Sequence, residues 1–463
     1  MEQTISNKPM IDRRKAFSAI DIGTTKIVAL VGYVNEKNEL TVLGRGVAPS
    51  MGVSRGEVIN IEYTVSSIKA AVKQAEEEAG FFCKKVVVGI AGKHIRTLQN
   101  RGGINRENPD KEITNEELEI LMQENRHVCL EADEEIIHAI PQTYIVDNNH
   151  EVTCPLGMHG RRIEANFHIV VGKGTAIKYI RTAIQRAGLE VSELLLEPLA
   201  SAKSTLTEEE KRLGVAILDI GGGTTDVAIF HNNVVQFTEV IPFGGNAITH
   251  DISVECNILE ELAEKLKVEY GCAIQDVVKD NEIVSIPGVH GRPPKEISFK
   301  VLAGIIQARM EEILDAALFV IKTSGYGKYL SQGIVVTGGG SLMQHLTQLI
   351  NFKINKDAKI GTPIHCVNYM NAREFSNPIY ATGVGLLMRA AELHKAQNVH
   401  VEVENTIHNQ TKEQVQPAAV KQTATPKVEE HKKEKNNYIY KLVEKFFGDT
   451  ATDTKLSETG VGK

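Results

Sequence analysis

The chain has 463 residues, which is too many for one hydrophobic core, so two or more lobes are expected. Hydrophobic residues make up 42% of the composition and charged residues 24%, as in an ordinary soluble globular protein. The formal net charge of −7 argues against a general nucleic-acid binder, because such a protein needs a basic surface. We see no apolar signal segment and no run long enough to cross a bilayer, so any membrane contact is expected to be peripheral.

One pattern occurs twice, in residues 16–49 and in residues 214–246. Each copy has an apolar strand ending in Asp-Ile-Gly, a Gly/Thr turn, a second apolar strand, an Asn-containing turn and a third strand. Glycine and asparagine at such turns are typical of β-hairpins. Two copies of one β-meander, each near the start of a half, predict two related lobes that face each other.

Helical and strand patterns alternate after each meander. Helices are expected at residues 65–80, 113–128, 174–189, 258–271 and 301–325. Buried strands are expected at 85–91 and 333–340, and residues 194–206 predict a strand that turns into a helix. Strands that alternate with helices indicate an α/β fold.

Three glycine-rich turns have the composition of phosphate-binding loops. Glycine lets backbone N–H groups approach a phosphate closely, and threonine hydroxyls and a lysine add donors. The third turn follows a buried strand, where ligands sit in open α/β sheets. The candidate cofactor-binding residues in these turns are Gly23, Thr24, Thr25, Lys26, Gly221, Gly222, Gly223, Thr224, Thr225, Gly338, Gly339, Gly340 and Ser341. One such turn alone could be a tight hairpin, but three together disfavour that interpretation.

Together, the motifs Asp-Ile-Gly-Thr-Thr, Leu-Asp-Ile-Gly-Gly-Gly-Thr-Thr-Asp and Val-Thr-Gly-Gly-Gly-Ser resemble the superfamily of actin, sugar kinases and heat-shock chaperone ATPases. This resemblance implies ATP between two lobes, with the phosphates on the first two loops and the adenosine on the third. It also implies Mg²⁺ near Asp21 and Asp219, with Asp226 close by. An Asp at the end of a buried strand suits a hydrated magnesium ion, which takes few carboxylates.

Two further positions are candidates because of the same resemblance. Glu264 and Lys267 match the helix that flanks the purine and ribose, although their spacing alone indicates an ordinary i, i+3 ion pair. Glu197 lies before Pro198 at a strand-to-helix junction that faces the γ-phosphate in relatives, so it could orient the attacking water. It could equally be a strand-end residue with no catalytic part, and the protein is expected to be at most a slow ATPase.

An insertion in the first lobe, residues 85–165, narrows the resemblance. Its two patterns consist of Pro141, Gln142, Tyr144, Val146 and Asp147, and then of Pro155, Gly157, Met158, Gly160, Arg162 and Glu164. They are similar to the extra subdomain of the FtsA family of bacterial cell-division proteins, and the resemblance covers residues 16–392. It implies an actin-like protein that polymerises, binds the tubulin-like FtsZ through the outer subdomain of the second lobe, and recruits later division proteins.

The expected domain boundaries follow. A flexible N-terminus occupies 1–15; the first-lobe core occupies 16–84, 166–205 and 376–395; the second-lobe core occupies 206–245 and 301–375; and the outer subdomain occupies 246–300. Residues 396–435 are polar without apolar periodicity, which predicts a disordered linker. A short helix over 436–448 and a flexible tail over 449–463 complete the chain.

The helix over 436–448 resembles the C-terminal targeting helix of the FtsA family, which implies binding to the cytoplasmic face of the cell membrane at the division site. Its apolar residues fall on one helical stripe, formed by Tyr438, Ile439, Leu442, Val443, Phe446 and Phe447. Lysines flank the stripe, which suits an interfacial helix on an anionic leaflet. The same stripe could instead dock on the globular body or in a partner groove.

Two other functions remain as alternatives. A small-molecule, sugar-type kinase shares the superfold, but it would need a polar acceptor pocket with a catalytic Asp, and none is evident. An ATP-binding adaptor of pilus assembly has a similar insertion, but the amphipathic C-terminus counts against it.

Overall fold

The structure is a computed structural model that describes residues 16–35, 39–126, 128–148, 151–286, 293–363, 367–369 and 375–396. The predicted N-terminus, amphipathic helix and tail, with all six predicted membrane residues, lie outside the described residues. The predicted linker also lies outside them, except for Ala396, which is helical.

The first lobe is built on a sheet whose described strands have the order β11-β6-β1-β2-β3-β19. The predicted meander is present, since β1 pairs antiparallel with β2 and β2 with β3. β6 lies inside this sheet and pairs parallel with β1, so the chain leaves it after Ile90, later than the predicted boundary at residue 85. The strands are β1 (Ala16–Ile22), β2 (Lys26–Val34), β3 (Leu40–Pro49), β6 (Lys85–Ile90), β11 (Glu190–Leu196) and β19 (Val367–Tyr369).

Helices cover both faces of the first-lobe sheet, which explains why β1 and β2 are almost wholly buried. α1 (Ile61–Ala79) and α3 (Gly174–Arg186) pack on one face. α4 (Glu197–Thr205) and a helix over 381–396 pack on the other. α1 begins before the predicted residue 65, because Asn60 caps it by accepting a hydrogen bond from the Tyr63 N–H at 3.1 Å. A small hairpin, β4 (Val53–Ser54) with β5 (Glu57–Val58), precedes this helix.

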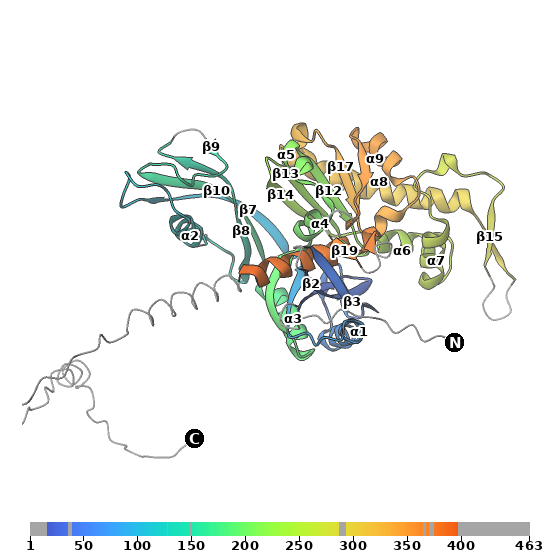
Figure 1. Cartoon of the computed structure of the whole chain (residues 1–463). Coiled ribbons are helices and arrows are strands. Elements are labelled where there is room, and N and C mark those ends of the chain that lie inside the picture. The colour runs from blue at the N-terminus through green and yellow to red at the C-terminus, as the bar shows by residue number, and fades with distance from the viewer. Residues whose placement is uncertain are drawn as a thin grey trace, which may run out of the picture. The chain divides into compact units, whose positions relative to one another are not determined.

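The insertion forms a separate sheet with the order β7-β10-β8-β9 among the described strands (Figure 1). Its strands are β7 (Ile95–Asn105), β8 (Glu134–Val146), β9 (Glu151–Val152) and β10 (Arg162–Lys173), and its helix is α2 (Asn115–Glu124). Leu121 of α2 packs with Phe167 and Ile169 of β10 in a small core of their own. The insertion therefore has its own core, as expected of a subdomain.

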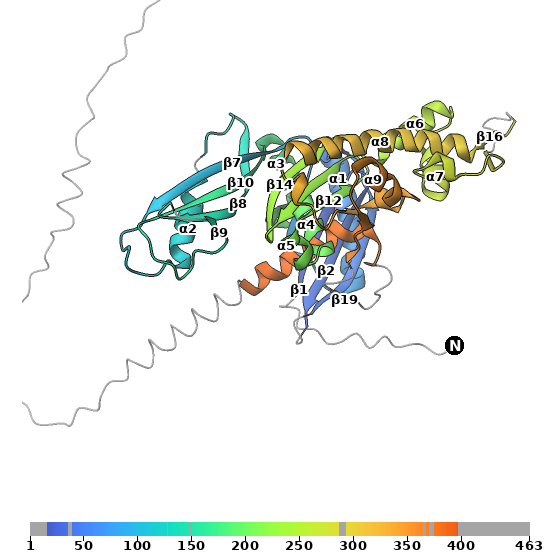
Figure 2. The same cartoon turned by 90° about the horizontal axis from the view of Figure 1, so that it is seen from above.

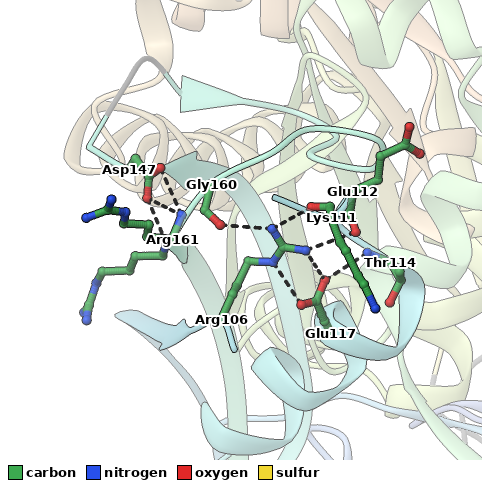
Figure 3. A network of polar contacts seen from close by, with 9 residues as sticks. Arg106, Lys111, Glu112, Thr114, Glu117, Asp147, Gly160 and Arg161 are labelled. Atoms are coloured by element: carbon green, nitrogen blue, oxygen red, sulfur yellow. Dashed lines mark hydrogen bonds and ion pairs between the residues drawn. The ribbon is translucent and has the colours of Figure 1, made fainter. Parts of the chain in front are cut away.

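A buried guanidinium fixes the loops at the far end of the inserted sheet (Figure 3). Arg106 donates two hydrogen bonds of 2.9 Å to the Glu117 carboxylate and further ones to the carbonyls of Lys111, Glu112 and Gly160. Because every donor is directed at an acceptor of this chain, we interpret Arg106 as a structural residue.

The inserted sheet also contacts the second lobe. Gln142 of β8 donates hydrogen bonds of 2.9 Å to the carbonyls of Val235 and Gln236 on β14 (Val234–Ile241). His168 of β10 is fully buried and lies 2.8 Å from the Thr238 hydroxyl of the same strand. Gln142 belongs to the Pro-Gln-x-Tyr pattern of the insertion, so that pattern includes a residue joining the insertion to the second lobe.

The second lobe repeats the meander. Its described strands have the order β14-β13-β12-β17-β18, with β12 antiparallel to β13 and parallel to β17. The further elements are β12 (Val215–Ile220), β13 (Thr225–His231), β17 (Ile334–Thr337), β18 (Ala358–Ile360), α5 (Glu208–Leu213), α8 (Phe299–Thr323), α9 (Leu346–Ile354), η4 (Gly327–Tyr329) and η5 (Gly339–Leu342). α8 runs along this lobe as one long helix (Figure 2) and packs on the sheet through residues such as Ile306 and Ile313.

An outer subdomain follows the second meander. It contains α6 (Gly245–Glu255), α7 (Glu260–Tyr270), η2 (Gln275–Val277), β15 (Ile283–Ile286) and β16 (Lys295–Ser298). α8 starts just after it, two residues before the predicted residue 301, because the Ser298 hydroxyl caps the helix by accepting from the Lys300 N–H. Within the described ranges, no helix is both long and apolar enough to cross a membrane.

α4 lies between the two lobes. Ala200 belongs to the core of the first lobe, whereas Ala202 and Leu206 pack against β12 and β13 of the second. A short helix that begins with the candidate residue Glu197 thus contacts both lobes. This arrangement places Glu197 where both lobes meet.

Candidate functional site

A cavity of about 450 Å³ lies between the lobes, and residues of both lobes line it. The predicted site residues that line it are Asp21, Gly23, Thr24, Thr25, Lys26, Glu197, Asp219, Gly221, Gly222, Gly223, Thr224, Asp226, Glu264, Lys267, Gly338, Gly339 and Gly340. The fold therefore brings together residues that are far apart in the sequence.

Two predicted cofactor-binding residues do not line the cavity. Thr225 is fully buried, and its hydroxyl donates to the Phe243 carbonyl at 2.9 Å. Ser341 is also fully buried, and its hydroxyl donates to the Gly338 carbonyl at 2.7 Å. Because each hydroxyl holds a neighbouring turn, these two residues support the loops from outside the cavity lining.

The first two loops meet tip to tip across the cavity. A Cβ added at Gly223 would lie 2.4 Å from Thr24 Oγ1 and 2.9 Å from Thr24 Cβ. A Cβ added at Gly222 would lie 2.6 Å from Thr25 Oγ1. Real Cβ atoms do not approach so closely, so glycine at these positions allows the lobes to close.

The third turn is fitted closely to Asp219. Gly338 has a φ of +80°, a left-handed conformation that favours glycine, and a Cβ there would lie 2.3 Å from Asp219 Oδ1. The turn therefore places its backbone directly against the carboxylate at the end of β12.

Among the described residues, four carboxyl groups of the cavity have raised pKa values. Burial raises the pKa of Asp21 to about 7, with Lys26 opposing and Asp219 adding to the shift. Burial also raises the pKa of Asp219, although two hydroxyl donors oppose it. The pKa values of Asp226 and Glu197 lie well above their usual range, first through burial and then through repulsion from the other carboxylates. Burial and mutual repulsion therefore make it unfavourable for all four acids to be ionised at once.

Lys26 does not neutralise these acids by a direct ion pair. Its Nζ donates to the Ile379 carbonyl at 2.8 Å and lies 5.2 Å from the centre of the Tyr380 ring. Burial lowers the pKa of Lys26, and Asp21 and Asp219 raise it. Asp226 Oδ1 is buried without a hydrogen-bond partner. An uncompensated buried carboxylate oxygen of this kind fits a site that receives a cation.

The acids are not arranged as a direct ligand set. Nowhere in the described residues do three or more His, Cys, Asp or Glu side chains form a group that could hold a metal ion. Mg²⁺ usually keeps several waters and takes only one or two protein carboxylates beside phosphate oxygens. The carboxylates therefore suit a hydrated cation that phosphates also bind. They are not placed to hold a cation directly through Asp21, Asp219 and Asp226.

The spacing of Glu264 and Lys267 predicted an ion pair, and that pair is present. The two side chains form an ion pair with Lys267 Nζ 2.6 Å from Glu264 Oε2, and both line the cavity. Lys267 Nζ also donates to the Gly245 carbonyl at 3.0 Å, which ties α7 to the start of α6. The pair thus forms part of the wall of the cavity.

Several residues that were not predicted from the sequence also line the cavity. Asn246 lines the cavity at the start of α6, and its N–H donates to the Gly222 carbonyl at 2.8 Å. Its Pro-Phe-Gly-Gly-Asn context could have indicated a turn at a helix start, because Gly and Asn favour such positions. Met343 and Thr382 also line the cavity, and neither carries a local signal for a ligand site.

Two α/β lobes built on one repeated meander, with a shared cavity between them, define an actin-like protein. Consistent with this fold, a solved PilM–PilN type IV pilus biogenesis complex matches with a TM-score of 0.60 at 15% identity, over 83% of this chain and 99% of that chain. The chain is also 40% identical over 374 residues to the cell division protein FtsA of Pseudomonas aeruginosa, covering 81% of this chain and 89% of that protein. The chain therefore belongs to the FtsA family of cell-division proteins.

Two further relatives and two family models support membership of the FtsA family. The cell division proteins FtsA of Escherichia coli K12 and Bacillus subtilis 168 are each 33% identical, over 84% of this chain and 93% and 86% of theirs. The family model described as cell division protein FtsA matches residues 216–385, and that of the SHS2 domain inserted in FtsA matches 92–171. The second range contains β7, β8, β9 and nearly all of β10.

Proposed function

We propose that the protein binds Mg²⁺–ATP in the cavity, polymerises, and tethers FtsZ filaments to the cytoplasmic face of the cell membrane at the division site. The observation that best supports nucleotide binding is the group of buried carboxyl groups in a cavity that two glycine loops close from opposite lobes. Phosphates with a divalent cation are the ligand chemistry that such loops and acids suit.

The residues of the chain have distinct parts in this proposal. Backbone N–H groups of Gly222 and Gly223, together with the Thr24 and Thr25 region, would bind the phosphates. The Gly221 N–H donates to the Thr224 carbonyl at 2.9 Å and would hold the turn. Asp21, Asp219 and Asp226 would hold the hydrated cation, largely through its waters. A bound Mg²⁺ would supply charge neutralisation of the phosphates and the acids. The third turn, Glu264 and Lys267 would enclose the adenosine.

The FtsZ-binding surface is proposed for the outer subdomain over residues 246–300. Four apolar side chains there are between 51% and 60% exposed, namely Val254, Leu259, Val277 and Ile283. Exposed apolar groups of this size commonly mark protein interfaces. Membrane attachment is proposed for the segment 436–448, and recruitment of later division proteins is proposed from the family.

A sedimentation assay with full-length protein, FtsZ, ATP and anionic vesicles tests this function. FtsZ is expected in the vesicle pellet only when this protein and ATP are both present, because the protein is the link between filament and membrane. An equal amount of pelleted FtsZ without the protein would rule out the tether. A small-molecule kinase would leave FtsZ in the supernatant and consume ATP only with an acceptor.

Glu197→Gln is expected to slow ATP hydrolysis by about 100-fold or more while ATP binding stays within about threefold. General acid–base contributions are about 10²–10⁴-fold, and the substitution keeps the shape of the side chain. It also removes a group that the other acids repel. Phosphate release and ATP affinity measured on the same preparation check both parts.

Glu190→Gln serves as the control, since Glu190 begins β11, the strand before Glu197, and is exposed. It is expected to change neither quantity. An unchanged rate of phosphate release in Glu197→Gln would assign Glu197 a purely structural role.

A further inference from the structure

Two hydroxyl groups of the first lobe bind the carboxylate of Asp219 in the second lobe. Thr382, in the helix over 381–396, donates to Asp219 Oδ2 at 3.0 Å. Ser201 of α4 donates to the same oxygen, and the two hydroxyl oxygens lie 3.0 Å apart. Ser201 is fully buried and Thr382 is 9% exposed. When Asp219 is ionised its carboxylate can only accept, and both hydroxyls then donate to it.

The packing of two helices brings these hydroxyls together. A Cβ added at Gly385 would lie 1.8 Å from the Ala200 carbonyl oxygen, so the helix over 381–396 touches the backbone of α4. The Ser204 hydroxyl donates to the Ala381 carbonyl at 2.7 Å and fixes the register of this contact. Thr382 and Ser201 are therefore held side by side before any ligand enters the cavity.

The other Asp219 oxygen is constrained as well. Oδ1 lies against Gly338, where an added Cβ would approach it to 2.3 Å. The carboxylate is thus fixed from two sides, by first-lobe hydroxyls at Oδ2 and by the third turn at Oδ1. Hydrogen bonds to a charged acceptor are stronger than those between neutral groups, and they gain further in a dry site.

We propose that Ser201 and Thr382 are positioning residues, a cross-lobe hydroxyl pair that orients Asp219 toward the cation of a bound Mg²⁺–nucleotide. The inference rests on the proposed function, and it adds two residues that the phosphate-loop motifs do not contain. Because Thr382 belongs to the first lobe and Asp219 to the second, their hydrogen bond also joins the two lobes beside the cavity.

The variants Thr382→Val and Ser201→Ala, singly and combined, test this proposal in the full chain. Valine has nearly the shape of threonine but cannot donate a hydrogen bond. ATP affinity is measured with MgCl₂ and again with EDTA. The combined variant is expected to bind ATP at least tenfold more weakly with MgCl₂ and within about twofold of wild type with EDTA. The single variant Thr382→Ser, which keeps the hydroxyl, is expected to bind ATP with MgCl₂ as wild type does.

The proposal would be overturned if the combined variant bound ATP with MgCl₂ as tightly as wild type does. It would also be overturned if the variant lost the same ATP affinity with MgCl₂ and with EDTA, because equal losses would indicate a structural role only. Absence of ATP binding by wild type would instead refute the proposed function.

A second pair of variants keeps the test decisive if the combined variant does not fold. Gly385→Ala pushes the helix away from α4 and is expected to cause the same loss with MgCl₂. Gly383→Ala, on the same helix, meets only Leu30 and Val28 carbons at 3.4 Å or more and is expected to bind like wild type. Equal behaviour of these two variants would contradict the proposal.

Discussion

Gly223→Ala is expected to weaken ATP binding by roughly 10- to 100-fold while each lobe stays folded. The added Cβ would lie 2.4 Å from Thr24 Oγ1 and 2.9 Å from both Thr24 Cβ and Cγ2. Thr24 is β-branched, and its hydroxyl accepts a hydrogen bond from the Gly56 N–H at 3.1 Å, so it cannot rotate away freely. Overpacking of this kind costs about 1–3 kcal/mol, and about 1.4 kcal/mol corresponds to a factor of ten.

Calorimetric titration with ATP and MgCl₂ measures this effect, and thermal unfolding without nucleotide checks the folding of the lobes. Gly221→Ala is the comparison variant, because its Cβ comes no closer than 3.2 Å to the Thr224 carbonyl and meets no first-lobe atom. It is expected to weaken binding much less. If both variants lose the same ATP affinity, the loss comes from a side chain added to the loop and not from a clash between the two lobes.

The double change Phe446→Asp with Phe447→Asp is expected to release the protein from anionic vesicles almost completely. These two residues contribute a third of the six-residue apolar stripe predicted for residues 436–448. Burial of one large apolar side chain is worth about 1.5–3 kcal/mol, and two new carboxylates are repelled by an anionic surface. A short helix of this length is not stable alone in water, so binding must also order it and leaves little surplus.

Vesicle co-sedimentation of the full chain measures this release. Thr450→Asp with Thr452→Asp is the control, since it adds the same charge beyond the apolar stripe. It is expected to retain most of the binding. If the double phenylalanine variant still sediments with vesicles as wild type does, the segment is not the membrane anchor, and docking on the globular body or in a partner groove becomes the better interpretation.

The α/β class, the repeated meander and the three glycine turns could be predicted from the sequence. Each is encoded by contiguous residues, and strand alternation, glycine at turns and Asp at a strand end all act locally. Local capping explains the two helices that begin before their predicted residues, since Asn60 and Ser298 cap α1 and α8. The motifs alone do not reveal that Thr225 and Ser341 lie outside the cavity lining.

The order of residue types along the chain was therefore enough to predict the two lobes, the glycine-turn motifs and the resemblance to the FtsA family. Which groups face one another depends on the folded arrangement. Thr382 meets Asp219 across 163 positions, and Gln142 meets β14 across 93 and 94. The pKa of Asp21, raised to about 7, likewise depends first on burial by distant residues and on neighbours such as Lys26 and Asp219. Such contacts come from the packing of helices and lobes, and no local pattern of residue types encodes them.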